Sequence, residues 1–362
     1  MIQDIITRPP IRVLVVDDSA FMRTALSRMI AAESDLEVVA TACSGAEAIE
    51  KIASLDPDVV TLDVEMPGLD GLQTLRQIMT RSPRPVIMVS AVNEKDAKNT
   101  FNALAAGAFD YVPKQLSVKS LDIFHINDDL LSKIRAAAQS RHYHPTTLVA
   151  RKPPQSQPKV RQESPFNAPA IVALGTSTGG PKALQEILPL FPRDLPIPIL
   201  IVQHMPPGFT APFAQRLNSL CALTVREAVN RETILPGVVY IAPAGLQMIV
   251  ERLSDSRTIL RLGTHPENSM HTPSVNVMMN SVAAVFGNLA LGVILTGMGS
   301  DGAEGMSAIY RRGGLTIGQD EATSTVYGMP RVCAELGILS RVVPLPLIPS
   351  HILHATRSRK QA

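Results

Sequence analysis

Two blocks of alternating apolar runs and amphipathic stretches constrain the fold of this chain more than any other feature of its sequence. The first block begins at Arg12 and the second at Ala170, and the apolar runs in both are of strand length. Strands that alternate with helices in this way are typical of parallel sheets covered by helices. The 362 residues also exceed what one hydrophobic core usually organises. We therefore expect an α/β fold with two domains.

The apolar runs that we interpret as strands are separated by stretches with helical periodicity. In the first block the runs are RVLVVDD, EVVATAC, DVVTLD, PVIMVSA and DYVP. In the second block they are AIVALG, IPILIVQH, VVYIAP, LGVILTG and GLTIGQD. After the first run, helical spacing predicts a core-facing stripe of Phe21, Met22, Ala25, Leu26, Met29 and Ile30.

A segment without periodicity separates the two blocks. It is rich in proline, glutamine, serine and basic residues, which is typical of a linker. We assign no role to its histidines, His142 and His144, because a metal site in a solvated tether is uncommon. The predicted organisation is a first domain over residues 11–135, a linker over 136–169 and a second domain over 170–355.

The charge and the cysteines exclude several classes of protein. The chain has 34 basic and 32 acidic side chains without a concentrated basic field, so we expect no nucleic-acid binding. Cys43, Cys221 and Cys333 lack metal-ligand spacing, which indicates free thiols in a reducing, cytoplasmic compartment. No apolar run reaches the length of a membrane span, and the N-terminus lacks a secretory pattern, so we expect no membrane insertion.

Polar side chains follow the predicted strands of the first block. Asp17 and Asp18 follow the first strand, Asp63 ends the third, Ser90 ends the fourth and Lys114 follows the fifth. These positions meet at one edge of a parallel sheet, where ligands bind. Three carboxylates in one pocket repel each other and favour a cation such as Mg²⁺. The cation and Lys114 would neutralise a phosphoryl group on Asp63, and the Ser90 hydroxyl would bond one of its oxygens. Helix capping explains a single aspartate but not the whole set.

Residues 11 to about 135 resemble a response-regulator receiver domain. The segments that carry the resemblance are VLVVDDS, VVTLDVEMPGLDG, MVSA and YVPK. The resemblance implies a flavodoxin-like fold, with Asp63 as the phosphoacceptor and Tyr111 at the aromatic switch position. The chain departs from the pattern at Gln115, where receivers usually have proline after the lysine. The Mg²⁺ ligands that the resemblance implies are Asp18, Asp63 and the backbone carbonyl of Glu65, supported by Asp17.

The second block contains a serine among glycines at the end of its first strand. In ALGTSTGGPKAL, Ser177 fits the G-x-S-x-G turn that exposes a serine hydroxyl between a strand and a helix. The same pattern also suits a phosphate-binding loop or a tight turn with a packing role only. A phosphate loop requires lysine directly after the glycines, whereas Lys182 follows a proline. We therefore interpret Ser177 as a nucleophile.

A histidine and an aspartate follow two further strands of this block. His204 follows the run PIPILIVQ, and Asp301 lies in LGVILTGMGSDGAEGM. One crevice would bring Ser177, His204 and Asp301 together as nucleophile, general base and orienting carboxylate. Taken singly, His204 fits a structural histidine and Asp301 a helix cap, but their joint placement favours chemistry. The order Ser, His, Asp differs from that of ordinary α/β-hydrolases, so we do not assign the domain to them.

Five runs of the second block resemble the catalytic domain of the chemotaxis protein-glutamate methylesterases, the CheB family. They are TSTGGPKAL, QHMPPGFT, LPGVVYIAP, LTGMGSDGAEGM and QDEATSTVYGMP. With the receiver-like block in front, nearly the whole chain matches the two-domain order of that family. The resemblance implies a doubly wound, Rossmann-like second domain. The roles that it implies are nucleophile for Ser177, base for His204, partner of the base for Asp301, and support of substrate and oxyanion for Thr178 and the Met298 backbone N–H.

Three loop residues depart from the family pattern. Thr272 and Asn276 stand where arginine and aspartate are expected, and Gln247 replaces a usual histidine. We expect such changes to affect substrate recognition while the chemistry is kept.

The resemblance implies a phosphorylation-activated hydrolase of chemotaxis adaptation. Ser177 would attack the γ-methyl ester of a glutamate on a chemoreceptor and release methanol, and deamidation of glutamine would be a second activity. A histidine kinase would phosphorylate Asp63, which shifts the packing of a receiver that otherwise covers the esterase crevice. Mg²⁺ would serve the receiver only.

Three other functions compete with this hypothesis. A receiver-controlled binding module with an inactive esterase fold is disfavoured because Ser177, His204 and Asp301 are all retained. A transcriptional regulator is disfavoured because the second half is long, strand-rich and neutral. The same hydrolysis in a signalling pathway outside chemotaxis stays open because of the altered loops.

Overall fold

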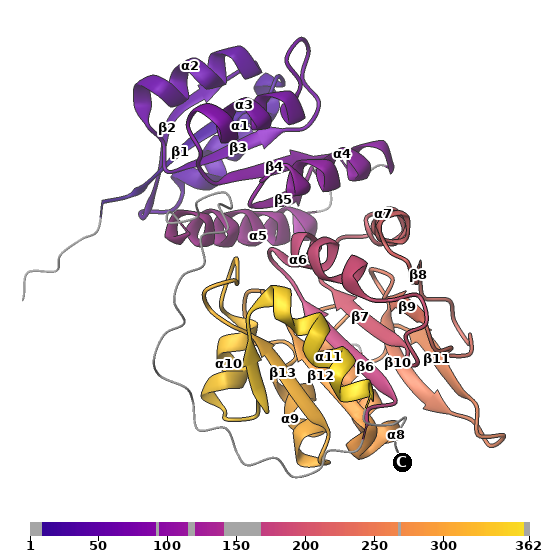
Figure 1. Cartoon of the computed structure of the whole chain (residues 1–362). Coiled ribbons are helices and arrows are strands. Elements are labelled where there is room, and N and C mark those ends of the chain that lie inside the picture. Colours follow the sequence, from indigo (N-terminus) through magenta and orange to yellow (C-terminus); the bar gives the residue numbers. More distant parts are fainter. Residues whose placement is uncertain (1–8, 92–93, 115–119, 141–167, 267–268, 358–362) are drawn as a thin grey trace, which may run out of the picture. The chain divides into compact units, whose positions relative to one another are not determined.

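The computed structural model (Figure 1) describes residues 9–91, 94–114, 120–140, 168–266 and 269–357. The chain forms two compact units, residues 1–149 and 150–362. His142, His144 and Gln115 lie outside the described residues. Among the helices within the described ranges, none combines the length and the apolar character that a membrane span needs.

The first unit is built on a five-stranded parallel sheet with the order β2-β1-β3-β4-β5, the flavodoxin-like order. This confirms the predicted α/β fold of the first block. The strands are β1 (Ile11–Val16), β2 (Leu36–Ala42), β3 (Val59–Asp63), β4 (Val86–Ser90) and β5 (Asp110–Pro113). The helices are α1 (Ala20–Ala31), α2 (Gly45–Leu55), α3 (Gly71–Arg81), α4 (Glu94–Ala105) and α5 (Ser120–Gln139).

Helix α1 buries a narrower stripe than its sequence predicts. The Ser19 side chain caps the helix by accepting a hydrogen bond from the Met22 N–H. Met22, Leu26 and Ile30, four residues apart, are buried against the sheet, whereas Phe21 is 70% exposed. The prediction that Phe21 faces the core is therefore wrong. Consecutive helix residues are rotated by about 100°, and Met22 already occupies the face that packs on the sheet.

The second unit is built on a seven-stranded parallel sheet with the order β14-β13-β12-β6-β7-β9-β8. Its strands are β6 (Ile171–Thr176), β7 (Ile199–Gln203), β8 (Thr224–Glu227), β9 (Val238–Ile241), β12 (Ala290–Ile294), β13 (Leu315–Gln319) and β14 (Arg341–Val343). Its helices are α6 (Gly180–Ile187), α7 (Thr210–Leu220), α8 (Val275–Phe286), α9 (Ala303–Arg311), α10 (Met329–Glu335) and α11 (Ile348–Arg357). Short 3₁₀ turns are η1 (Leu188–Leu190), η2 (Gly287–Leu289) and η3 (Leu345–Leu347).

Strand β6 lies at the point where the strand order of this sheet reverses. Its neighbours are β7, the next strand of the sequence, and β12, which comes much later. Every residue of β6 is buried, as are those of β7 and β12, so the centre of the sheet is also the centre of the core. Ligands of open α/β sheets bind at such a reversal, beyond the carboxyl ends of the strands.

An antiparallel hairpin, β10 (Gln247–Arg252) with β11 (Thr258–Gly263), lies outside the parallel sheet. Strand β10 packs on helix α8, where Met248 and Val250 join the same buried cluster as Met278 and Val282. The hairpin thereby covers the helix whose first turn lies at the candidate site described below.

Candidate functional site

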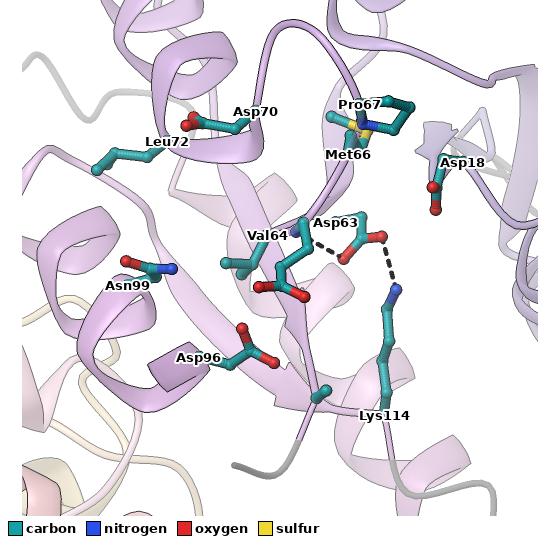
Figure 2. Close-up of a pocket in the computed structure, with 12 residues that line it drawn as sticks. Asp18, Asp63, Val64, Met66, Pro67, Asp70, Leu72, Asp96, Asn99 and Lys114 are labelled. Carbon is teal, nitrogen blue, oxygen red and sulfur yellow. Dashed lines mark hydrogen bonds and ion pairs between the residues drawn. The ribbon is translucent and has the colours of Figure 1, made fainter. Parts of the chain in front are cut away.

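Two aspartates of the first unit lie at neighbouring strand ends and share one lysine. Asp17 directly follows β1, and Asp63 is the last residue of β3, the strand beside it. The Lys114 Nζ, beyond β5, lies 2.7 Å from Asp63 Oδ2 and 2.9 Å from Asp17 Oδ2. Figure 2 shows Lys114 reaching Asp63 from the opposite side of the pocket to Asn99. The sheet therefore brings together the residues that the sequence predicts at its edge.

The carboxyl group of Asp63 is a weaker acid than an ordinary aspartate. The residue is 2% exposed, and this burial raises its pKa to about 6 although the hydrogen bond from Lys114 acts in the opposite direction. The N–H of Glu65 donates to Asp63 Oδ1 at 3.2 Å and fixes the other oxygen. Asp63 is thus held in one orientation with an oxygen at the pocket.

The acidic groups of this pocket fit a divalent cation. One oxygen each from Asp17, Asp18 and Asp63 lies within 4.8 Å of the others. With Lys114, these three carboxylates leave a formal charge of −2 when all are ionised. Hard cations such as Mg²⁺ bind through a few carboxylate oxygens and retain waters. The pocket has a volume of about 650 Å³, and Asp18, Asp63, Glu65 and Lys114 are among its lining residues, which gives room for those waters.

Of the remaining predicted residues of this unit, Ser90 lies at the same sheet edge, whereas Tyr111 lies two residues before the end of β5. Ser90 ends β4, and its hydroxyl accepts a hydrogen bond from the Thr100 hydroxyl at 2.8 Å. Tyr111, in β5, is buried, and the Lys133 Nζ lies 5.3 Å from the centre of its ring. Lys133 also donates to the Tyr111 carbonyl at 2.7 Å. These contacts link the predicted switch residues to helices α4 and α5.

In the second unit, Ser177, His204 and Asp301 follow the three adjacent strands β6, β7 and β12. The His204 backbone N–H donates to the carbonyl of Thr176 at 3.2 Å, which ties the end of β7 to the end of β6. The His204 Nε2 lies 2.8 Å from Asp301 Oδ2. The sheet thus places a histidine–aspartate pair beside the serine, at the reversal of strand order.

Asp301 is held by the first turn of helix α8. Its carboxylate accepts hydrogen bonds from Ser274 Oγ at 2.9 Å, from Val275 N at 2.7 Å and from Asn276 N at 3.0 Å. Burial alone raises the pKa of Asp301, but His204 and the backbone N–H groups of Asn276 and Val275 outweigh it and lower the pKa to about 2. The carboxylate is therefore ionised throughout the neutral range.

The bond to Asp301 decides which nitrogen of His204 is basic. An ionised carboxylate only accepts hydrogen bonds, so Nε2 of His204 carries the proton and Nδ1 carries the lone pair. No hydrogen bond joins the Ser177 hydroxyl to His204 in the part of the chain that the structure describes. Catalytic hydrogen bonds of this kind often tighten only when substrate is bound.

Backbone contacts fix Ser177 at the turn between β6 and α6. Its N–H donates to the Thr296 carbonyl at 3.1 Å, and its carbonyl accepts from Gly180 N at 2.8 Å and from Gln203 Nε2 at 3.0 Å. A Cβ on Gly297 would lie 2.8 Å from the Ser177 Cβ, so only glycine lets the loop after β12 pass this close.

Two backbone N–H groups beside Ser177 are available to a ligand. Thr178 N directly follows the serine, and Met298 N follows Gly297 in the loop after β12. Neither N–H donates a hydrogen bond to another group among the described residues. Free N–H groups at a strand-to-helix turn are the usual donors of an oxyanion hole.

Two residues that no sequence motif singled out also belong to the site. The ring of His271 stacks on that of His204, with 4.1 Å between ring centroids and 20° between planes. Ser274 caps α8 as well as contacting Asp301. A serine before the apolar run of α8 is a helix-capping signal in the sequence, but no sequence signal places His271 over His204.

The three residues that depart from the family pattern lie around the same pair. Gln247 Nε2 donates to the His271 carbonyl at 2.8 Å and to Thr272 Oγ1 at 3.4 Å. Asn276 Oδ1 accepts from the N–H groups of Gly302 and Gly305 at 2.9 and 3.0 Å, which caps helix α9. All three are neutral, so their contacts leave the charge at Asp301 unchanged.

Comparisons with known proteins assign both units. A family model described as CheB methylesterase matches residues 172–352, and one described as response regulator receiver domain matches residues 13–123. The chain is 42% identical over 366 residues to "Protein-glutamate methylesterase/protein-glutamine glutaminase 1" of Oleidesulfovibrio alaskensis, with 95% of this chain and 99% of the relative covered. It is 46% identical over 344 residues to a protein-glutamate methylesterase/protein-glutamine glutaminase of Caldanaerobacter subterraneus subsp. tengcongensis, with 92% and 93% covered.

A solved structure is similar to the second unit. It is the crystal structure of the Thermotoga maritima CheB methylesterase catalytic domain, with a TM-score of 0.50 and 38% sequence identity. The match covers 51% of this chain and 98% of that structure. The likeness thus extends over nearly the whole of a catalytic domain.

Proposed function

This chain belongs to the CheB methylesterase family and is a receiver-regulated protein-glutamate methylesterase/protein-glutamine glutaminase, and on that premise we propose that Ser177, His204 and Asp301 carry out the hydrolysis. The observation that carries the proposal is the 2.8 Å contact between His204 Nε2 and Asp301 Oδ2, beside Ser177 at the reversal of strand order. An ionised aspartate there fixes the tautomer of the base and stabilises the imidazolium that forms.

In the first half of the reaction, Ser177 Oγ attacks the carbonyl carbon of a glutamate γ-methyl ester. His204 Nδ1 takes the hydroxyl proton and gives it to the methoxy oxygen as the C–O bond breaks, which releases methanol and leaves a serine ester. In this proposal the N–H groups of Thr178 and Met298 donate hydrogen bonds to the oxygen that becomes negative. Asp301 keeps the imidazole of His204 oriented while the ring accepts the proton and while it donates the proton.

In the second half, water attacks the serine ester. His204 Nδ1 takes a proton from the water and returns it to Ser177 Oγ, so the glutamate carboxyl leaves and the enzyme is restored. The same steps act on a glutamine side chain, where the leaving group is ammonia instead of methanol. No metal is needed for either half.

The first unit supplies the regulation. We assign Asp63 as the phosphoacceptor, with Asp17, Asp18, Asp63 and the Glu65 carbonyl as the groups that would hold Mg²⁺. When bound, the cation supplies positive charge that neutralises the phosphoryl oxygens. Lys114 lies where it would pair with a phosphoryl oxygen, and Ser90 and Tyr111 lie where they would respond to it.

The partners of the protein follow from its family. The proposed substrates are chemoreceptors, the proposed phosphodonor is a chemotaxis histidine kinase, and the proposed compartment is the cytoplasm. Three free cysteines agree with a reducing compartment. We propose no nucleic-acid partner and no insertion into a membrane.

Methanol release from membranes that carry methylated chemoreceptors tests the proposal. We expect Ser177→Ala to lower the rate at least about 1,000-fold, because the acyl-enzyme cannot form without the nucleophile. Ser219→Ala is the matched control, since Ser219 is exposed on α7 and its hydroxyl donates to the Arg216 carbonyl of the same helix. Release that persists in Ser177→Ala contradicts the assignment of the nucleophile. No release by the native protein would favour a binding module or a different substrate.

A further inference from the structure

The orientation of His204 depends on more than its bond to Asp301. Rotation about the bond between ring and Cβ is broad for histidine, so a single hydrogen bond leaves the ring free to swing. Here one face of the ring is covered by His271, at 4.1 Å between centroids and nearly parallel. A ring stacked this way restricts rotation of the His204 imidazole, which keeps its Nε2 at Asp301.

The segment that carries His271 is itself anchored by a buried side chain. Gln247, the first residue of β10, is 1% exposed. Its Nε2 donates to the His271 carbonyl at 2.8 Å, and its Oε1 accepts from the Ser274 N–H at 2.8 Å. One glutamine therefore spans the backbone from His271 to Ser274.

Both ends of this span reach the catalytic pair. At one end, His271 stacks on His204. At the other end, the Ser274 hydroxyl donates to Asp301 at 2.9 Å. The hairpin strand β10 is thus connected, through one side chain, to the base and to its carboxylate.

We propose that His271 is a positioning residue of the hydrolysis, that it acts by stacking on His204, and that Gln247 is the side chain that holds it in place. This inference rests on the proposed function, because it assumes that His204 is the base. Displacements of about 1 Å in a catalytic group commonly cost about 100-fold in rate, so a ring that fixes the base has a large effect.

The charge of His271 agrees with this role. Burial lowers the pKa of His271, and the neighbouring His204 lowers it further, while Asp301 acts in the opposite direction. His271 is therefore neutral at pH 7 and leaves the carboxylate of Asp301 to the imidazolium of His204. A neutral, flat side chain is what a stacking role requires.

The experiment compares His271→Ala with His271→Phe in the full chain, measuring methanol release at several substrate concentrations. We expect His271→Ala to lower kcat about 10- to 100-fold with KM changed less than about 3-fold, because the substrate contacts remain. His271→Phe keeps a flat ring and should restore kcat to within about 3-fold of the native protein. His354→Ala, at an exposed position of α11, is the control for loss of a histidine elsewhere.

The anchoring role is tested by a double-mutant cycle. Gln247→Met keeps the size of the side chain and removes its hydrogen bonds to His271, Thr272 and Ser274, so we expect kcat to fall about 5-fold or more in the native background. In the His271→Ala background the same substitution should have a clearly smaller effect. Thermal unfolding by circular dichroism verifies that each variant is folded.

Three results overturn the inference. The first is a His271→Phe variant as slow as His271→Ala, because stacking would then not be the cause. The second is a raised KM with unchanged kcat in His271→Ala, which indicates a substrate contact. The third is a Gln247→Met effect that is equal in both backgrounds. Ser177→Ala in the same assay separates these three results from a failure of the proposed function. If the proposed function is wrong, methanol release does not depend on Ser177.

Discussion

At the scale of single residues, Asp301 is the side chain on which most contacts of the catalytic site converge. Its two oxygens accept four hydrogen bonds, from His204, Ser274, Val275 and Asn276. Two of the donors are backbone N–H groups at the start of α8, where the helix dipole also favours negative charge. Asp301 is therefore a structural residue of the second unit as well as a proposed partner of the base.

The lowered pKa of Asp301 predicts how acid weakens the second unit. The folded-state pKa is about 2 against an ordinary 3.8, so ionised Asp301 stabilises the fold at pH values above about 4. This contribution, of about 2 kcal/mol, is lost as the pH falls from about 4 through about 2. We expect the stability advantage of the native protein over Asp301→Asn, measured by urea unfolding, to shrink over that interval. An advantage that stays constant down to pH 2 contradicts the shift.

The sequence could predict Ser177, His204 and Asp301 as a set because each follows a strand, and strand ends of a parallel sheet meet. It could not predict His271, which lies in a loop without periodicity and reaches His204 only through the packing of β10 and α8. Gln247 departs visibly from the family pattern, but its hydrogen bonds to His271, Thr272 and Ser274 depend on how β10 packs against the loop before α8. Contacts set by loops follow from tertiary packing and leave no local pattern.

At the scale of elements, helices α8 and α9 cap each other. Asp301, which precedes α9, accepts from the first N–H groups of α8. In return, Asn276 of α8 accepts from Gly302 N and Gly305 N of α9. The four unpaired N–H groups at a helix start need such acceptors. The two helices therefore fix Asp301 between their N-terminal ends.

This arrangement predicts that substitution of Ser274 lowers both the stability of the fold and the rate of hydrolysis. Ser274→Ala removes the cap of α8 and the hydroxyl that donates to Asp301. We expect the free energy of unfolding to fall by about 1–2 kcal/mol and kcat to fall as well. Ser274→Thr keeps the hydroxyl and should recover most of both losses. Urea unfolding and methanol release provide the two measurements, and an unchanged kcat in folded Ser274→Ala argues against a role at Asp301.

The apolar runs were predicted correctly as strands, but four other strands were missed. Every apolar run interpreted as a strand coincides with a strand of one of the two parallel sheets. No strand was predicted for β8, β14 or the β10–β11 hairpin. Strand β8, with the sequence TVRE, contains one apolar residue, and β14 has only three residues, so neither forms an apolar run of strand length. The hairpin does have a sequence signal, since two apolar runs flank the turn residues Ser254 to Ser256.

At the scale of the whole molecule, both units place their candidate site at the reversal of strand order of a parallel sheet, although the chemistry of the two sites is unrelated. In the first, Asp17 and Asp63 follow β1 and β3, adjacent strands where the order of the sheet reverses. In the second, Ser177 follows β6 at the equivalent reversal. A crevice at such a point is a property of the topology, which explains why the strand pattern of the sequence is enough to locate both candidate sites.

Phosphorylation should connect the two sites. We expect a small phosphodonor with Mg²⁺ to raise methanol release by the native protein and to have no effect on Asp63→Asn, because asparagine cannot form the acyl phosphate. Basal release by Asp63→Asn should stay within about 2-fold of the native rate. Asp128→Asn, at an exposed position of α5, is the control and should respond normally. Full activation of Asp63→Asn by the phosphodonor is the outcome that rules out Asp63 as the acceptor.

The distance along the chain between His204 and Asp301, 97 residues, has a consequence for synthesis. Translation delivers Ser177 and His204 well before Asp301 and strand β12, which takes its place between β6 and β13 at the centre of the sheet. Until then the nascent chain has a serine and a histidine but no carboxylate to orient the base, and β6 has an open edge. On the proposed assignment, a chain that ends before Asp301 lacks the carboxylate that orients His204, so we expect hydrolysis only once the second unit is nearly complete.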